Sequence, residues 1–423
     1  MNPTTDAALR PATHSPRIHY IDWLRVLAVL LLFPFHVSRV FNSGEPFYVK
    51  DAGTSAPLGY VLWFIDVWHM PLLFFLAGAS THYALRKRSG GSYLLERVKR
   101  LLVPFLFGFL VLIPPQTWLG GRFNSDYTGS FFHYLASGDF LVWNVRDGGD
   151  YFGGFGIGHL WFILMLFLLS IFALPFFLGG RTVRGTRGSA GIARLLAKRS
   201  AWLLAAFFIM IGEALPDPSG GLAFFYNLAF FVLGYLAFAD QAFAAGAARH
   251  RRLALGGGVA LTLFWILSGN LRNPLPDPSF ARAGLTLLGC LATWLMIVGL
   301  LGYGRRYLDR TSPALGYLAE GSYPIYILHQ TVIVVIAFYL VSLPGPWPLH
   351  WVLLFATSVA GTFALYEVIR RLPVRVLLGM RLGRASHAGT RTRESEGAAS
   401  TSDVLDAGSI APPRTAQDGP RKI

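Results

Sequence analysis

The chain alternates between long apolar stretches and short polar segments from about residue 18 to about residue 372. A helix of roughly 17–25 apolar residues is long enough to cross the hydrocarbon core of a bilayer. We find ten such stretches, at about residues 20–41, 57–85, 95–118, 157–178, 200–215, 221–240, 252–269, 281–303, 314–342 and 349–370. The pattern predicts an all-α, polytopic integral membrane protein of about ten transmembrane helices.

Composition supports this fold class and excludes several kinds of site. Hydrophobic residues make up 53% of the chain and charged residues only 14%, whereas soluble domains carry about 25% charged residues. The single cysteine, Cys290, lies in the eighth predicted span, which excludes a disulfide framework and a cysteine-based metal site. Since no His and carboxylate set has recognised metal-ligand spacing, we also expect no metal site.

The basic residues indicate how the chain is oriented in the membrane. Of 37 Lys and Arg, thirty fall at the two ends or in alternate connecting segments, six fall in the remaining segments, and Arg25 lies within a span. By the positive-inside rule, both termini are cytoplasmic. The net charge of +15 follows from this topology, and no basic face on a soluble module indicates nucleic-acid binding.

We expect three parts along the chain: a cytoplasmic N-terminal segment (1–17), a transmembrane domain (18–372), and a basic, then disordered cytoplasmic tail (373–423). From about residue 385 the tail consists of small, polar and charged residues without periodicity, which is typical of disorder. We do not expect the first span to be a cleaved signal peptide, because it is long, is interrupted by Arg25 and is followed by further spans.

The first predicted span carries ionisable side chains along one stripe. Arg25 and His36 are eleven residues apart, so they differ by only about 20° around a helix, and Asp22 lies within about 40° of the same line. Such groups within a span normally face a protein interior or a water-filled cavity. We therefore favour a functional His36 over a structural one. For Arg25, donor binding is as favoured as the alternative, in which its side chain extends to the membrane interface or pairs with Asp22.

Two other spans carry polar stripes. Ser322, Tyr326 and His329 fall at positions i, i+4 and i+7 of the ninth span, where a polar lining and simple packing are equally favoured. Asp66 and His69, at i and i+3 of the second span, form either a carboxylate–imidazole pair or a hydrogen bond between packed helices.

Two further positions lie near span ends. Arg97 and Arg100 stand at i and i+3 where the third span begins, and guanidinium groups bind phosphate through paired hydrogen bonds. The alternative is that both arginines serve only as cytoplasmic positive charges that orient the chain in the membrane. His159 opens the fourth span and is either an acceptor-binding residue or an interfacial one.

Five of these motifs occur in an order that resembles the membrane acyltransferase-3 family over about residues 18–372. They are Arg25-x10-His36, His69-Met-Pro, Arg97-x-x-Arg100 with Pro104, His159-Leu-Trp-Phe and Ser322-Tyr-Pro-Ile-Tyr326-Ile-Leu-His329. The His-Met-Pro and His-Leu-Trp-Phe elements look most similar to the branch of glucan biosynthesis protein C, a glucan succinyltransferase.

The resemblance implies an enzyme of the cell (inner) membrane that moves an acyl group, such as acetyl or succinyl, across the bilayer. Acyl-CoA in the cytoplasm would be the co-substrate, with no permanently bound cofactor. A carbohydrate or other extracytoplasmic molecule would supply the acceptor hydroxyl. The expected partners are this donor, this acceptor and the lipid bilayer, and the oligomeric state is left open.

We assign expected roles to ten residues. His36 is the general base, His329 orients it or the donor, and Tyr326 donates to the thioester oxygen. Donor-phosphate binding is expected of Arg25, Arg97 and Arg100, and substrate binding of Asp66, His69, His159 and Ser322. The alternatives are a transporter, with Arg25, His36, Asp66 and His329 forming a substrate or proton path, and a non-catalytic scaffold.

Overall fold

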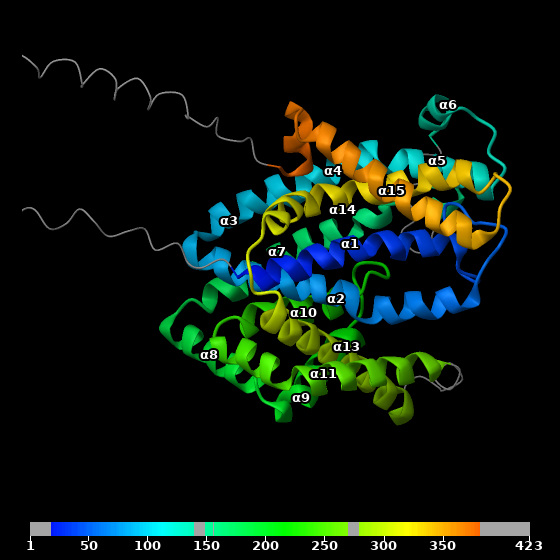
Figure 1. Cartoon of the computed structure of the whole chain (residues 1–423). Helices are drawn as coiled ribbons and strands as arrows, with labels where there is room; N and C mark the ends of the chain where they lie inside the picture. The colour runs from blue at the N-terminus through cyan, green and yellow to red at the C-terminus, as the bar shows by residue number, and fades with distance from the viewer. Residues whose placement is uncertain (1–17, 139–148, 155, 270–278, 381–423) are drawn as a thin grey trace, which may run out of the picture. The chain divides into compact units, whose positions relative to one another are not determined.

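The computed structural model describes residues 18–138, 149–154, 156–269 and 279–380. Every regular element in these residues is a helix (Figure 1), which confirms the all-α prediction. The expected N-terminal segment 1–17 and the tail from residue 381 onward lie outside the described residues.

The first half of the chain contains α1 (His19–Phe41), α2 (Ala56–Lys87), α3 (Gly90–Arg97), a π-helical turn η1 (Val98–Leu102), α4 (Val103–Val111), α5 (Ile113–Asn124), α6 (Phe131–Ala136) and the 3₁₀ turns η3 (Gly149–Phe152) and η4 (Gly158–Leu160). Then follow α7 (Trp161–Gly179), α8 (Val183–Leu196), η5 (Arg199–Ala201), α9 (Trp202–Ala214), α10 (Phe224–Ala237), α11 (Gln241–Leu267), α13 (Phe280–Tyr307), α14 (Pro313–Leu340), α15 (Trp347–Ile369) and η6 (Pro373–Leu378).

The number of spans differs from the expected ten. Among the described residues, seven helical stretches are long and apolar enough to cross a membrane, or nine if each of two bent helix pairs counts as one span. The predicted fifth and sixth spans correspond to α9 and α10, which have only 13 and 14 residues. A straight crossing needs about 20 residues. Instead α9 joins α8 at a bend of 101°, and α10 joins α11 at 106°.

Helix α1 lies at the centre of the bundle and packs against α2, α13, α14 and α15 (Figure 1). Its apolar positions Val26, Leu32, Phe33, Val37 and Val40 are almost completely buried. A helix that is apolar on most of its surface is either a core helix or a membrane span, and here protein neighbours cover α1 on several sides. The stripe that carries Arg25 and His36 therefore faces protein and not lipid.

Proline 71 illustrates how polar backbone groups are satisfied within the apolar bundle. Pro71 lies inside α2, and a proline inside a helix leaves the carbonyl four residues earlier without its usual partner. That carbonyl belongs to Val67, and the Thr293 hydroxyl of α13 donates to it at 3.0 Å. Neighbouring helices satisfy such freed groups in membrane proteins.

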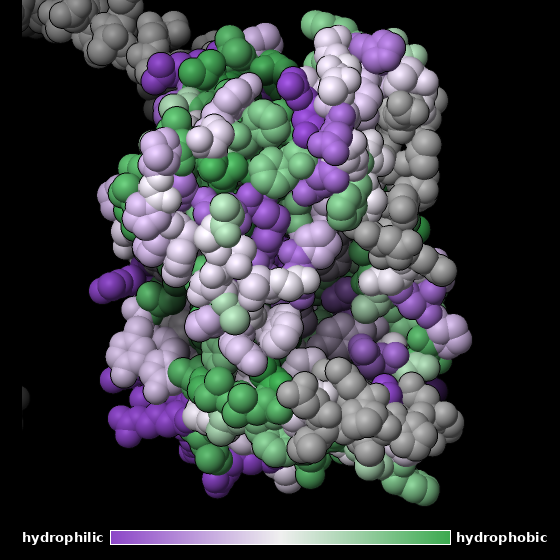
Figure 2. Space-filling model, turned by 90° about the vertical axis from the view of Figure 1, so that its right-hand side faces the viewer, coloured by the Kyte–Doolittle hydropathy of each residue, from purple (hydrophilic) through white to green (hydrophobic). Residues whose placement is uncertain are grey.

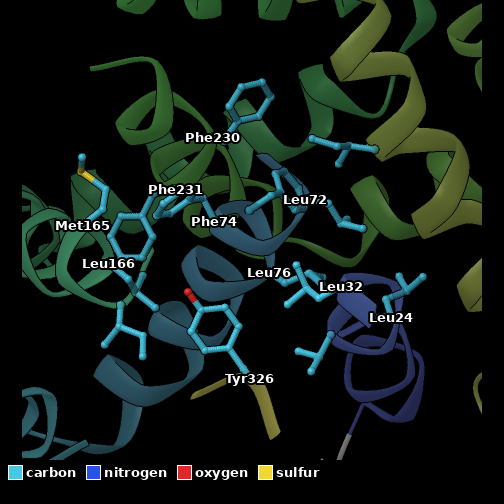
Figure 3. Packing of buried hydrophobic residues seen from close by; sticks show 14 of the residues in the cluster. Leu24, Leu32, Leu72, Phe74, Leu76, Met165, Leu166, Phe230, Phe231 and Tyr326 are labelled. Atoms are coloured by element: carbon cyan, nitrogen blue, oxygen red, sulfur yellow. The ribbon is translucent and has the colours of Figure 1, made fainter. Parts of the chain in front are cut away.

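Helices α2 and α10 cross with their backbones almost in contact. A Cβ atom added at Gly78 would lie 2.0 Å from the Phe231 carbonyl oxygen, and one at Gly234 would lie 2.0 Å from the Phe75 oxygen. Only glycine permits this approach from both sides, as in other tightly packed membrane helices. Phe74, Phe230 and Phe231 gather beside this crossing (Figure 3).

Candidate active site

Three histidines from separate elements meet at one point in the bundle. His36 comes from α1, His159 from η4 and His329 from α14. The ring centroids of His36 and His329 are 5.1 Å apart, and those of His159 and His329 are 5.2 Å apart. The predicted stripes of the first and ninth spans thus face each other.

Backbone carbonyls determine which ring nitrogen of two histidines carries the proton. His329 Nδ1 lies 2.6 Å from the Tyr326 oxygen, and His159 Nε2 lies 2.9 Å from the Ile327 oxygen. A carbonyl only accepts, so each of these nitrogens must donate its N–H. His329 Nε2 and His159 Nδ1 are buried and have no hydrogen-bond partner. Each therefore presents an unshared lone pair.

Two of the three rings border a cavity of about 290 Å³, which we call the histidine chamber. His36 and His159 line it directly, together with Arg39, Trp161 and Gln330. His36 is partly exposed, and its Nδ1 is also buried without a partner. His329 is buried behind them. Buried polar atoms normally have partners, so unpaired nitrogens beside a cavity indicate a place for a ligand.

Two connecting segments form one wall of the chamber, at the end of the bundle where α1 ends. Tyr48 and Tyr151 line it, and the Tyr48 hydroxyl donates to the Asp150 carboxylate. The pKa of the Asp150 carboxyl is raised, because the effect of burial outweighs the opposing effect of the hydrogen bond from Tyr48. Burial also raises the pKa of the Tyr48 phenol well above its ordinary value.

Lys50 binds the C-terminal end of α1 through hydrogen bonds. Its ammonium group donates to the Arg39 carbonyl at 2.9 Å and to the Asn42 side-chain oxygen at 2.9 Å. Cations near the last turn of a helix stabilise its free carbonyls. Burial lowers the pKa of Lys50 to about 8. Sequence reasoning did not find Arg39, Tyr48, Lys50 or Asp150, and only Arg39, three residues after His36, gave a periodic signal.

The predicted donor-binding arginines lie towards the opposite end of α1. Arg25 pairs with Asp22 at 3.1 Å and donates to the Ser80 hydroxyl at 2.8 Å. Arg97 donates to the next residue of α2, Thr81, at 3.2 Å, and its guanidinium carbon lies 4.6 Å from the centre of the Tyr93 ring. Two cations from α1 and α3 therefore approach the same turn of α2.

Arg100 lies further out, in the π-helical turn η1. Its side chain is 42% exposed and its Nε is 3.4 Å from the Glu96 carboxylate. The predicted pair is thus divided, since Arg97 points into the bundle while Arg100 faces the surface.

The remaining predicted residues lie outside the chamber lining. His69 is buried, with Nε2 2.7 Å from the Ala28 carbonyl of α1, so it joins two packed helices. Ser322 donates to the Ala319 carbonyl of its own helix at 3.1 Å. The Tyr326 hydroxyl donates to the His159 carbonyl and so connects α14 to η4.

Asp66 lines a second, larger cavity of about 820 Å³. Three indole rings border it, those of Trp63, Trp161 and Trp265, and we call it the tryptophan cavity. Trp161 and Leu222 line both this cavity and the histidine chamber. The two spaces therefore adjoin.

Comparisons with known proteins identify the bundle. A family model described as an acyltransferase domain, the acyltransferase-3 model, matches residues 18–367. The glucans biosynthesis proteins C of Salmonella typhi and Salmonella typhimurium are each 24% identical over 378 residues, covering 85% of this chain and 94% of the relative. That of Salmonella paratyphi A is 23% identical over the same shares. No solved structure matches the chain. The resemblance seen in the sequence is confirmed: the chain is a multi-pass membrane protein and an acyltransferase that belongs to the acyltransferase-3 family.

Proposed function

We propose that this protein transfers an acyl group, such as acetyl or succinyl, from cytoplasmic acyl-CoA to a hydroxyl of a carbohydrate at the outer face of the cell (inner) membrane. Two relatives are named for glucan biosynthesis, which favours a carbohydrate acceptor. The observation that carries the proposal is the meeting of three histidine rings beside a chamber within an acyltransferase-3 bundle.

His36 is the general base in this proposal. It lines the chamber and is partly exposed, whereas His159 and His329 are buried. A neutral imidazole can take the proton of an acceptor hydroxyl as that hydroxyl attacks. His329 donates its Nδ1–H to the Tyr326 carbonyl, which leaves a lone pair on its Nε2. This lone pair stabilises the imidazolium that forms on His36, whose ring centroid is 5.1 Å from that of His329.

The reaction balances without any other reactant. The acceptor oxygen forms a bond to the thioester carbonyl carbon, and the carbon–sulfur bond breaks. The proton that His36 took from the hydroxyl then passes to the departing thiolate. The products are the acylated carbohydrate and CoA with a free thiol.

The arrangement of α1 suits a donor that is charged at one end and thin at the other. Eleven residues separate Arg25 from His36, or roughly 16 Å along the helix. We place the CoA phosphates near Arg25 and Arg97, where guanidinium groups favour phosphate. The pantetheine arm then extends along α1 and brings the thioester to the chamber.

The test uses His36→Gln, which keeps the size of the side chain but removes the base. Loss of a general base lowers the rate by about 10²–10⁴-fold, so transfer from labelled acyl-CoA to a glucan acceptor should fall by that factor while acyl-CoA binding persists. The matched control is His133→Gln on α6, because the His133 side chain is exposed. This variant should transfer the acyl group at the wild-type rate. Transfer by His36→Gln at the wild-type rate would contradict the proposal.

A further inference from the structure

The tryptophan cavity has no role in the reaction described above. We propose that it binds the non-reacting part of the acceptor, an uncharged oligosaccharide, and that the reacting hydroxyl enters the histidine chamber past Trp161 and Leu222. This inference rests on the proposed function, because it names the site that presents the acceptor to His36.

The side chains around this cavity suit sugar rings. Trp63, Trp161 and Trp265 offer flat apolar faces, on which the C–H face of a sugar packs. Asp66 and Glu213 offer carboxylate oxygens that accept hydrogen bonds from hydroxyls. Neither carboxylate forms a hydrogen bond or ion pair with another described residue. Apolar walls with a few polar groups are typical of small-molecule sites.

Size and charge narrow the ligand class. At about 820 Å³ the cavity lies within the range of roughly 300–1,000 Å³ that holds a ligand of several rings. The described lining contains two carboxylates and one guanidinium, that of Arg282. This balance disfavours polyanions, which include the CoA phosphates and anionic glycans, and favours a neutral chain of sugars.

The position of the cavity agrees with an acceptor that arrives from outside. Its lining comes from the start of α2, the end of α9, the start of α10, and the facing ends of α11 and α13. In the predicted topology all of these ends face the outer side. Figure 2 looks onto this end of the bundle and shows a hollow with hydrophilic side chains inside it.

A labelling experiment tests binding without requiring catalysis. Thr286 lines the cavity, and Thr286→Cys is made in a Cys290→Ala background, so that it carries the single thiol. A membrane-impermeant maleimide is added to sealed cells or right-side-out vesicles, with and without a neutral glucan oligosaccharide. The glucan should slow labelling of Cys at position 286 at least several-fold, whereas a sulfated oligosaccharide or acyl-CoA should not.

The matched control is Ser125→Cys in the same background, because Ser125 is exposed and lies outside both cavities. Its labelling should not respond to the glucan. Absence of labelling at position 286 without sugar, lack of protection, or equal protection by the sulfated sugar would each overturn the inference. Repeating the experiment in His36→Gln separates the two proposals, since protection there shows acceptor binding whether or not His36 is the base.

Kinetics provides the second measurement. Asp66→Asn keeps the shape but removes a charge-assisted hydrogen bond, so the KM for the acceptor should rise about ten- to a hundredfold while the KM for acyl-CoA stays unchanged. Asp126→Asn is the matched control, since Asp126 is exposed and lines neither cavity. An unchanged acceptor KM in Asp66→Asn would remove Asp66 from the site.

Discussion

At the scale of single residues, the clearest feature is the fixed proton position on His159 and His329. Each donates one N–H to a backbone carbonyl of α14. Neither ring can therefore exchange tautomers without losing a hydrogen bond within an apolar bundle, which is costly. The lone pairs of His159, which lines the chamber, and of His329 behind it are therefore held in place before any substrate arrives, and such preorganisation lowers an activation barrier effectively.

A second residue-scale feature, the buried Asp150, predicts a pH dependence of stability. Burial holds its folded pKa above the ordinary value of 3.8, so its contribution favours folding at low pH and is lost as the pH rises through the folded pKa. In Asp150→Asn the amide oxygen still accepts the hydrogen bond from Tyr48, but the side chain cannot ionise, so no stability is lost as the pH rises. We therefore expect the variant to melt at a temperature equal to or above wild type at pH 7.5.

Melting in detergent, followed by tryptophan fluorescence, measures this difference. The advantage of Asp150→Asn should shrink between pH 7.5 and pH 4.5. If the variant were instead less stable than wild type at pH 7.5 and equal to it at pH 4.5, the charged carboxylate would be a stabilising group.

Helical periodicity predicted part of the candidate site from the sequence. A period of 3.6 residues placed Arg25 and His36 on one face, and both do face protein. The same reasoning put His329 on a polar stripe of the ninth span, and the structure brings this stripe to His36. It could not find Tyr48 or Asp150, because they lie in connecting segments where no period relates a residue to its neighbours in space.

At the scale of elements, the third predicted span is broken into α3, the π-helical turn η1, α4 and α5. The π-helical turn contains Lys99 and Arg100 and follows directly after Arg97. Such turns occur often at functional sites. Arg97, just before this turn, points inward to Thr81 and Tyr93, while Arg100 within it stays at the surface.

This division predicts that Arg97 contributes more to donor binding than its neighbours. Arg97→Lys keeps the charge but loses the planar fork, so the KM for acyl-CoA should rise about tenfold or more with little change in the acceptor KM. Lys99→Ala, an exposed position in the same turn, should leave both values unchanged. An unchanged acyl-CoA KM in Arg97→Lys together with a raised one in Lys99→Ala would mean that the region acts only through its total charge.

Three of the ten predicted spans, which correspond to α9, α10 and α11, belong to the two bent helix pairs instead of standing alone. The apolar runs at 200–215 and 221–240 look like the others in the sequence. However, α9 begins only after the turn η5, and α10 ends at Ala237, shortly before α11 begins at Gln241 in a different direction. Hydropathy measures whether a segment tolerates an apolar environment, not whether it crosses a bilayer in a straight line.

At the scale of the whole molecule, the orientation is the main prediction to test. Ser89 and Ser125 are both exposed and lie in the predicted cytoplasmic and outer segments, respectively. In a Cys290→Ala background, Cys at position 125 should react with an impermeant maleimide in intact cells, and Cys at position 89 only after permeabilisation. Labelling of both from outside would overturn the predicted topology and, with it, the outer position of the tryptophan cavity.

The crossing at Gly78 and Gly234 has a mechanical consequence. At this point backbone touches backbone, so there is no side chain whose rotation lets the two helices slide. The walls that α2 and α10 give to the tryptophan cavity lie on the far side of this contact, at Asp66 and Asn227. The crossing therefore fixes the spacing of the two helices that form these walls, and a methyl group at either glycine would force the helices apart and widen the cavity between them.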